Sequence, residues 1–205
     1  YIEDFKLQNF EKNPVVICSL GDNSVTEGEV AEAFQFAALH QLPIIFLVQD
    51  NEWGISVTKE EARTSDAYDY AAGFVGLNRM RIDGTDFVES FIQMQKAVHF
   101  VREERKPLLV CAKTVLIGHH TSGVRREFYR DEADLAKHRA KDPGIILKKY
   151  LLEEGFSEET LSQIEIEARK QIEEDFNKAI LAPDPKPETV KEHVYAPTPI
   201  TEEKG

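Results

Sequence analysis

The sequence predicts an α/β protein built on a parallel β-sheet with helices on both faces. Three short apolar runs, often β-branched, predict buried strands at residues 15–20, 44–49 and 108–115. A helical pattern separates the first two runs, and alternation of strand and helix is typical of parallel sheets. The composition agrees, because 205 residues with 41% hydrophobic and 30% charged side chains can bury a sizeable core.

The segment between the first two predicted strands has the spacing of an amphipathic helix. Its apolar residues recur at intervals of three and four: Val30, Ala33, Phe34, Ala37 and Ala38. Thr26 and Glu29 match a capping box, so we expect this helix to begin at Thr26. Pro43 then ends the connection to the second strand.

A fourth strand, a second helix and a long loop follow. The run "NRMRID" at 78–83 predicts the strand, "DGTD" a turn, and residues 87–105 the helix. Phe91, Met94, Gln95, Val98 and Val101 share one side of that helix. Residues 118–130 are polar and without periodicity, and unstructured loops of this length are often functional.

The remainder divides the chain into three parts. Helical patterns cover about 131–140, 143–154 and 157–181, and a segment with five prolines follows them. We therefore predict an α/β domain over 1–130 that includes the loop 116–130, a helical segment over 131–182, and an extended tail or linker over 183–205. The chain opens without an initiator methionine and soon reaches a strand, so we expect a fragment that lacks an N-terminal part.

Charge and cysteine content exclude several classes of function. The net charge of -12 disfavours binding to nucleic acid or to anionic lipid. No window approaches the roughly 18 apolar residues of a membrane span, and the N-terminus has no secretory signal pattern. Cys18 and Cys111 both lie in apolar runs, which predicts buried thiols in a reducing compartment. We expect a cytoplasmic protein with neither nucleic-acid nor membrane partners.

Two polar residues directly follow the first two predicted strands. Asp22 lies in "SLGDNSVTEGEV", and Asn51 comes 29 positions later (51 - 22). Neighbouring parallel strands lie about 4.8 Å apart, and open α/β sheets bind ligands at the carboxyl ends of their strands. Carboxylate and amide oxygens suit magnesium, which often also binds phosphate, and a helix start offers N–H groups to that phosphate. The pattern predicts a metal and phosphate site.

Other interpretations of this stretch are weaker. A calcium loop requires glycine and glutamate where Glu27 and Ala33 stand. A dinucleotide fingerprint requires a glycine at the position of Asn23. A purely structural role, in which Asp22 caps a turn and Asn51 bends a loop, is common for single residues after strands, but the pair favours a site.

At this point the chain resembles a known family. The stretch "GDNSVTEGEVAEAFQFAALHQLPIIFLVQDNEWGIS" is similar to the thiamine diphosphate motif, in which Gly-Asp-Gly is followed further on by Asn-Asn. With "RIDGTD", "GHHTSGVRREFYR" and "HVYAPTP", residues 15–199 resemble the alpha subunit of the decarboxylating component of 2-oxo acid dehydrogenase complexes, of the branched-chain or pyruvate type. The resemblance implies the cofactors thiamine diphosphate and magnesium, bound by the 1–130 domain.

The resemblance also assigns roles at matching positions. Asp22 and Asn51 match the magnesium ligands, and Trp53 stands where an aromatic residue lends its backbone carbonyl to the metal. Asn23 and Ser24 match positions whose backbone amides touch the diphosphate. Asn23 replaces the second glycine of the motif, which departs from the family pattern.

Two further positions concern phosphate binding. Gln49 matches a position that some members fill with a phosphate-binding arginine, and Asp50 replaces the first asparagine of the motif. His120 matches the catalytic histidine that contacts the cofactor phosphate and faces the reaction centre, while His119 is secondary.

The remaining charged and histidine side chains receive weaker assignments. Arg125, Arg126 and Arg130 either order the loop, line an anionic path or form a solvated basic patch. Four histidines receive no role: His40, His99, His138 and His193.

The function implied by the resemblance is oxidative decarboxylation of a 2-oxo acid, with acyl transfer to a lipoyl-bearing acyltransferase. The family's cofactor-activating glutamate belongs to a beta subunit or a fused beta half, so we expect an alpha2 beta2-type assembly and no activity from this chain alone. Two alternatives stay open: another thiamine diphosphate enzyme, of the acetoin dehydrogenase or transketolase type, and a non-catalytic docking module of the same fold.

Overall fold

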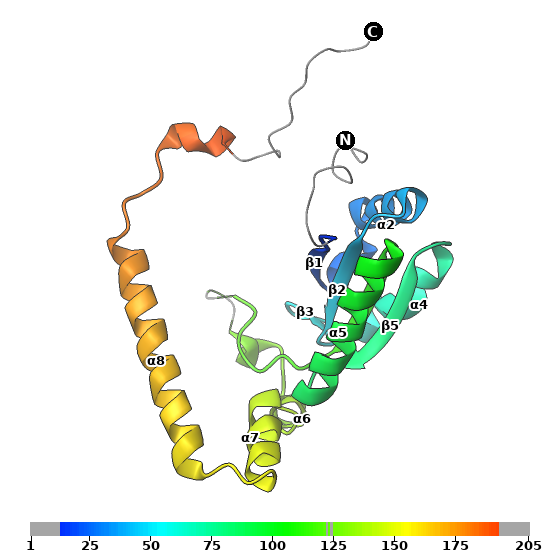
Figure 1. Ribbon diagram of the computed structural model, residues 1–205. Coiled ribbons are helices and arrows are strands. Elements are labelled where there is room, and N and C mark those ends of the chain that lie inside the picture. The colour runs from blue at the N-terminus through cyan, green and yellow to red at the C-terminus, as the bar shows by residue number, and fades with distance from the viewer. Residues whose placement is uncertain (1–12, 122, 124, 193–205) are drawn as a thin grey trace. The chain divides into compact units, whose positions relative to one another are not determined.

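The computed structural model describes residues 13–121, 123 and 125–192 (Figure 1). The chain forms two compact units, residues 1–154 and 155–205. The first unit contains a parallel sheet of four strands in the order β1-β2-β6-β5. These strands are β1 (Val16–Gly21), β2 (Ile44–Asp50), β5 (Asn78–Asp83) and β6 (Leu108–Lys113). The predicted α/β architecture with a parallel sheet is confirmed, and each strand lies within two residues of its predicted bounds.

Helices and a small hairpin complete the first unit. The hairpin pairs β3 (Trp53–Gly54) with β4 (Val57–Thr58). The α-helices are α2 (Gly28–His40), α3 (Lys59–Ala62), α4 (Ala67–Tyr70), α5 (Phe87–Glu104), α6 (Glu132–Arg139) and α7 (Pro143–Glu153). Three short 3-10 turns are η1 (Asn23–Thr26), η2 (Ala71–Gly73) and η3 (Arg126–Phe128), the last within the predicted loop.

The helices cover both faces of the sheet (Figure 1). Successive side chains along each strand point to opposite faces and form two separate hydrophobic clusters. On one face Phe34 of α2 packs edge-on against Phe46 of β2, with ring centres 4.8 Å apart. On the other face Val101 of α5 packs into a cluster that includes Ile45 of β2. Alternation along β2 therefore places Asp50 on the α2 and α4 face.

The predicted start of α2 is wrong. The helix begins at Gly28, and Glu27 before it makes no side-chain capping bond. The hydroxyl of Thr26 instead donates to the backbone oxygen of Asn23 at 3.1 Å, which closes η1. The physical reason is that Asp22 accepts a hydrogen bond from the N–H of Asn23, so a 3-10 turn forms before the α-helix can begin.

The second unit is described by itself. It contains α8 (Glu158–Leu181), which begins where the N–H of Thr160 donates to the hydroxyl of Ser157, and η4 (Pro187–Lys191). His193 and the motif "HVYAPTP" fall outside the described residues. Within the described parts of both units, no helix combines the length and apolarity needed to cross a membrane.

Candidate cofactor and metal site

Asp22 joins the carboxyl end of β1 to the loop that follows β2. Its side chain is only 3% exposed. One carboxylate oxygen accepts the N–H of Asn23 at 3.1 Å, and the other accepts the N–H of Glu52 at 3.2 Å. Glu52 has the left-handed φ of 69°, which is uncommon for a residue with a side chain. The structure thus brings Asp22 against the segment that contains Asn51.

Asn51 and Trp53 shape that segment. The side-chain oxygen of Asn51 accepts the N–H of Trp53 at 2.9 Å. The Trp53 ring is largely buried, its centre 5.8 Å from that of Tyr129 and 5.2 Å from the guanidinium carbon of Arg130. Because an amide oxygen has two lone pairs, the side-chain oxygen of Asn51 can keep this hydrogen bond and also coordinate a cation.

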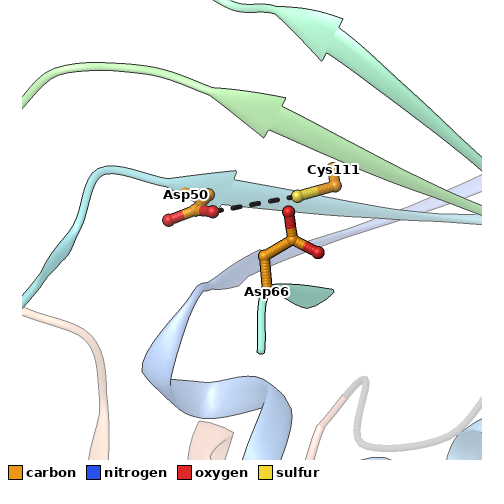
Figure 2. Close-up of side chains that lie close together, drawn as sticks. All are labelled: Asp50, Asp66 and Cys111. Atoms are coloured by element: carbon orange, nitrogen blue, oxygen red, sulfur yellow. Dashed lines mark hydrogen bonds between the residues drawn. The ribbon is translucent and has the colours of Figure 1, made fainter. Parts of the chain in front are cut away.

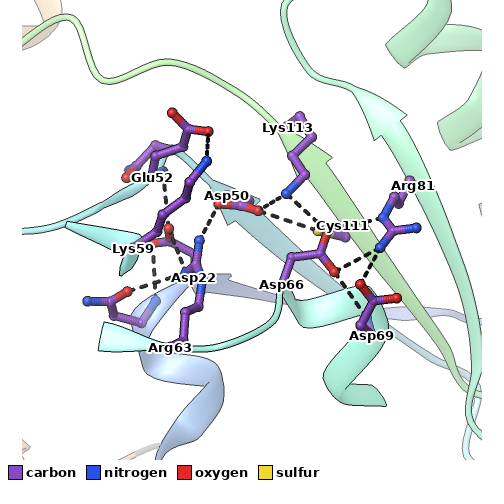
Figure 3. Close-up of polar contacts among 12 residues, drawn as sticks. Asp22, Asp50, Glu52, Lys59, Arg63, Asp66, Asp69, Arg81, Cys111 and Lys113 are labelled. Atoms are coloured by element: carbon purple, nitrogen blue, oxygen red, sulfur yellow. Dashed lines mark hydrogen bonds and ion pairs between the residues drawn. The ribbon is translucent and has the colours of Figure 1, made fainter. Parts of the chain in front are cut away.

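The cation that Asp22 holds in this structure is a side chain, Arg63, to which the sequence assigned no role. One guanidinium nitrogen lies 2.8 Å from Asp22 Oδ2, and the other lies 2.6 Å from Asp50 Oδ1 (Figure 3). The Arg63 side chain is 6% exposed. A buried carboxylate pair at this point could have suggested a basic partner, but nothing in "KEEARTSD" marks Arg63 as that partner.

Asp50 anchors a chain of ion pairs that runs across the sheet. Its neighbour in the β2–β6 register is Lys113, whose ammonium group contacts the Asp50 carboxylate. The same ammonium lies 3.0 Å from Asp66, which also binds Arg81 at 3.1 Å. Figure 3 shows that these alternating charges continue from Arg63 through Asp50 to Arg81.

The charges in this network respond differently to burial. Burial disfavours the charged form of Asp50, but the Lys113 ammonium and the Arg63 guanidinium outweigh it, so the pKa of Asp50 lies below its ordinary value. For Asp22, burial dominates over Arg63 and raises the pKa. Asp22 is therefore more readily protonated than Asp50.

One cluster near this network has the composition of a metal site. Ligand atoms of Asp50, Asp66 and Cys111 all lie within 4.8 Å of one another (Figure 2). However, the Lys113 ammonium already contacts both carboxylates. Burial also raises the pKa of the Cys111 thiol, and metals bind the thiolate. We assign no metal to these three residues.

The predicted diphosphate contacts lie on different sides of the sheet. Asn23 and Ser24 belong to η1, directly after Asp22, and Ser24 is exposed. Gln49 is also exposed, and its side-chain amide donates to the hydroxyl of Ser19 at 3.0 Å. Since Gln49 faces away from Asp50 along β2, the structure does not bring its side chain to Asp22.

The Asn23 side chain is accommodated by a glycine. A Cβ atom on Gly54 would lie 1.8 Å from Nδ2 of Asn23. We therefore expect Gly54→Ala to lower the free energy of unfolding by about 1–3 kcal/mol, because the chain must shift to relieve the overlap. Urea unfolding measures this loss. Combining the change with Asn23→Gly should reduce the loss to below about 1 kcal/mol, and additive effects of the two changes would contradict the contact.

The histidine loop is fixed at its ends by buried polar groups. Arg130 has no exposed side-chain area; it donates to the backbone oxygen of Leu116 at 2.7 Å and pairs with Asp134 at 2.6 Å. His138 is also buried, and its Nδ1 accepts the N–H of Leu116 at 3.0 Å. Burial lowers the pKa of His138, which suits a neutral acceptor. Arg130 and His138 thus order this loop.

His120 lies on the exposed part of the loop. Among the residues that the structure describes, it forms no hydrogen bond or ion pair with the other predicted site residues. Its neighbour His119 accepts the N–H of Arg126 at 3.2 Å through Nδ1. Arg125 is exposed on the same loop. The structure therefore brings Asp22, Asn23, Asn51 and Trp53 together, but not His120.

A cavity of about 430 Å³ opens beyond the carboxyl ends of β2, β5 and β6. Its lining has four acidic and four basic side chains: Asp50, Glu52, Asp83, Glu89, Arg81, Lys113, Lys137 and Lys141. Because these charges balance, the lining favours neither an anion nor a cation.

Glu52 should make the stability of the first unit depend on pH. Burial opposes its charge, but Lys59 and Lys137 lower the pKa of Glu52 to about 2, against 4.5 ordinarily. Its contribution to stability is therefore present above pH 4.5 and is lost as the pH falls toward 2. We expect Glu52→Gln to reduce the loss of unfolding free energy between about pH 6 and about pH 3 by about 1 kcal/mol, after allowance for solvent screening.

Urea unfolding at several pH values measures the effect of Glu52. The matched control is Glu60→Gln, since Glu60 is exposed and only 3.8 Å from the same Lys59. Equal pH dependence in the Glu52 and Glu60 variants would show that Glu52 makes no special contribution.

Comparison with known proteins identifies the family of this chain. The family model for the dehydrogenase E1 component matches residues 5–188. The 3-methyl-2-oxobutanoate dehydrogenase subunit alpha of Mycobacterium tuberculosis is 31% identical over 92% of this chain and 52% of its own length. The mitochondrial somatic-form alpha subunit of the pyruvate dehydrogenase E1 component of Homo sapiens is 29% identical over 95% of this chain and 50% of its own length.

Structural similarity is more limited. A transketolase structure from Campylobacter jejuni aligns with 48% of this chain and 15% of its own, with 26% identity and a TM-score of 0.43. That score is too low to establish a shared fold. The chain spans about half the length of the two curated relatives. The family model, in contrast, covers most of this chain, from residue 5 to residue 188. The chain therefore belongs to the dehydrogenase E1 component family.

Proposed function

We propose that this chain supplies the diphosphate and magnesium half of an active site that decarboxylates a 2-oxo acid. Family membership supports this proposal, as do the names of the relatives, which specify 3-methyl-2-oxobutanoate and pyruvate dehydrogenases. The observation that carries it is the buried carboxylate of Asp22, held between the end of β1 and the loop after β2 with a cationic group on it. This arrangement is built to hold positive charge.

The residues at this point fit a hydrated magnesium ion that also binds diphosphate. Asp22 and Asn51 would supply side-chain oxygens and Trp53 its backbone carbonyl, all of them hard donors. The backbone amides of Asn23 and Ser24, in η1, would face the diphosphate; Ser24 is exposed, whereas the N–H of Asn23 would have to leave Asp22. Thiamine diphosphate, when bound, supplies the electron sink for decarboxylation. We leave Gln49 out of this set, because it bonds Ser19 on the opposite face.

His120 is proposed as the catalytic residue contributed by this chain. It is exposed on a loop whose ends are fixed by Arg130 and His138, so it is available to a bound substrate. An imidazole there can hold or deliver a proton near neutral pH. This role makes the loop 116–130 part of the cofactor-binding domain.

The complete enzyme is proposed to require a beta subunit or a fused beta half, in an alpha2 beta2-type assembly. The acyl unit would pass to a lipoyl group on an acyltransferase partner, whose disulfide is reduced as the acyl carbon is oxidised. The relatives are named as alpha subunits, which supports a partner of this kind.

The test is decarboxylation by the full-length protein assembled with its beta part. Reduction of an artificial electron acceptor is measured with 3-methyl-2-oxobutanoate, pyruvate and a ketose phosphate, and release of labelled carbon dioxide is measured with the two 2-oxo acids, because a ketose phosphate releases none. Turnover of either 2-oxo acid that requires both thiamine diphosphate and magnesium is the expected result. Turnover of the ketose phosphate alone would favour a transketolase-type enzyme. Absence of turnover with all three, despite a folded assembly, would favour the docking module.

A further inference from the structure

Two buried carboxylates share a single arginine at the proposed metal site. Asp22 and Asp50 are 3% and 1% exposed, so each would be costly to ionise without a partner. Asp50 also has Lys113, whereas Arg63 supplies the side-chain cation that contacts Asp22 among the described residues. Arg63 therefore neutralises the very carboxylate that the metal would use.

A divalent ion and this guanidinium would compete for the Asp22 carboxylate, whose other oxygen, Oδ1, accepts the N–H of Asn23 at 3.1 Å. Asp22 Oδ2 already accepts Arg63 at 2.8 Å and the N–H of Glu52 at 3.2 Å. Magnesium requires ligand oxygens at about 2.0–2.1 Å in near-octahedral geometry. Two cations on one buried oxygen also repel each other strongly, because the local dielectric constant is low. Metal and Arg63 cannot both occupy this position.

Arg63 can leave Asp22 without losing all its partners. Its second nitrogen lies 2.6 Å from Asp50 Oδ1, and the oxygen of the Asn23 side chain lies 3.3 Å from the first nitrogen. Arg63 lines a cavity of about 300 Å³, together with Asp22 and the threonines Thr26 and Thr64. The guanidinium nitrogen that contacts Asp50 can thus stay in place, while the nitrogen that contacts Asp22 turns into this cavity.

We propose that Arg63 is an internal counter-cation that occupies the metal position and must release Asp22 before a divalent ion binds. The affinity of the site for metal is then set by competition with the protein's own arginine. Asp50 keeps the displaced arginine in place, so the exchange is reversible. This inference rests on the proposed function, since it presupposes a metal at Asp22.

The test is a titration of Mn²⁺ into the full-length chain assembled with its beta part. Electron paramagnetic resonance measures the concentration of free Mn²⁺ at each step, which gives the dissociation constant. Arg63→Met removes the competing charge and keeps the apolar stem of the side chain. We expect it to bind Mn²⁺ about ten- to a hundredfold more tightly than the wild type, the equivalent of losing one charge-assisted hydrogen bond. The matched control is Arg81→Met, which removes a cation from the same network without touching Asp22 and should change affinity by less than about twofold.

Two further variants decide between explanations. Arg63→Lys keeps a positive charge but replaces the two guanidinium nitrogens that contact Asp22 and Asp50 with a single ammonium nitrogen, so it should fold normally and bind Mn²⁺ a few times more tightly than the wild type. Asp22→Ala introduced together with Arg63→Met should abolish the gain. If the Arg63 variants bind Mn²⁺ no more tightly than the wild type, or if Arg81→Met gives an equal gain, the competition is refuted while the proposed function stands. If no variant and no wild-type sample binds Mn²⁺, both are refuted.

Discussion

Asp22→Ala is expected to abolish magnesium-dependent binding of thiamine diphosphate, weakening it by more than about a hundredfold. The change removes a charged metal ligand, whereas even the groups that merely orient such ligands contribute about ten- to a hundredfold. It also removes the hydrogen bonds that the Asp22 carboxylate accepts from the N–H groups of Asn23 and Glu52. Calorimetric titration of the cofactor with magnesium present measures the loss. Asn51→Ala should have the same effect.

The contrast for Asp22→Ala is His120→Ala. His120 is exposed and forms no bond to the described groups around Asp22, so its loss should leave cofactor binding intact and lower turnover. Wild-type affinity in the Asp22 variant would remove the metal assignment. Loss of binding in the His120 variant would instead place that histidine at the diphosphate anchor.

The second large effect is expected at Arg130. Arg130→Met should lower the free energy of unfolding by about 3 kcal/mol, because Asp134 and the backbone oxygen of Leu116 lose a buried partner. The histidine loop should also open more often, so trypsin should cleave at Arg125 or Arg126 faster than in the wild type. Urea unfolding and timed proteolysis measure the two effects.

Arg125→Met provides the matched control for Arg130. Arg125 is exposed on the same loop, so its replacement should change the unfolding free energy by less than about 0.5 kcal/mol. Equal destabilisation by the two changes would show that burial of Arg130 is not what orders the loop.

The strands β1, β2 and β6 could be predicted from sequence because each is a continuous apolar run. The structure buries most of β2 and β6, but the prediction that β1 is buried is wrong, since Val16 and Ile17 are about half exposed. The runs at β1 and β2 also set where Asp22 and Asn51 fall, since both residues follow a strand end. The start of α2 could not be predicted, because Thr26 and Glu29 fit a capping box equally well whether or not a 3-10 turn comes first. The hydrogen bonds of the Asp22 carboxylate and the Thr26 hydroxyl favour the 3-10 turn, and these contacts cannot be predicted from the capping-box pattern.

Arg63 and His138 illustrate what local patterns omit. Both are surrounded by polar residues in the sequence, yet both are buried by segments far along the chain. Arg63 meets Asp22 across 41 positions (63 - 22), and His138 meets Leu116 across 22. No periodicity encodes such contacts. Asp50 stands where the family motif has an asparagine, and this substitution could have predicted a basic partner such as Arg63, because a second buried carboxylate requires a second cation.

The most direct measurement is calorimetric titration of thiamine diphosphate into the full-length protein assembled with its beta part, with and without magnesium. Binding that requires magnesium is the predicted result, because Asp22 would reach the diphosphate only through the ion. No binding in either condition, from an assembly shown to be folded, would mean that this chain keeps the fold of its family without the family's chemistry.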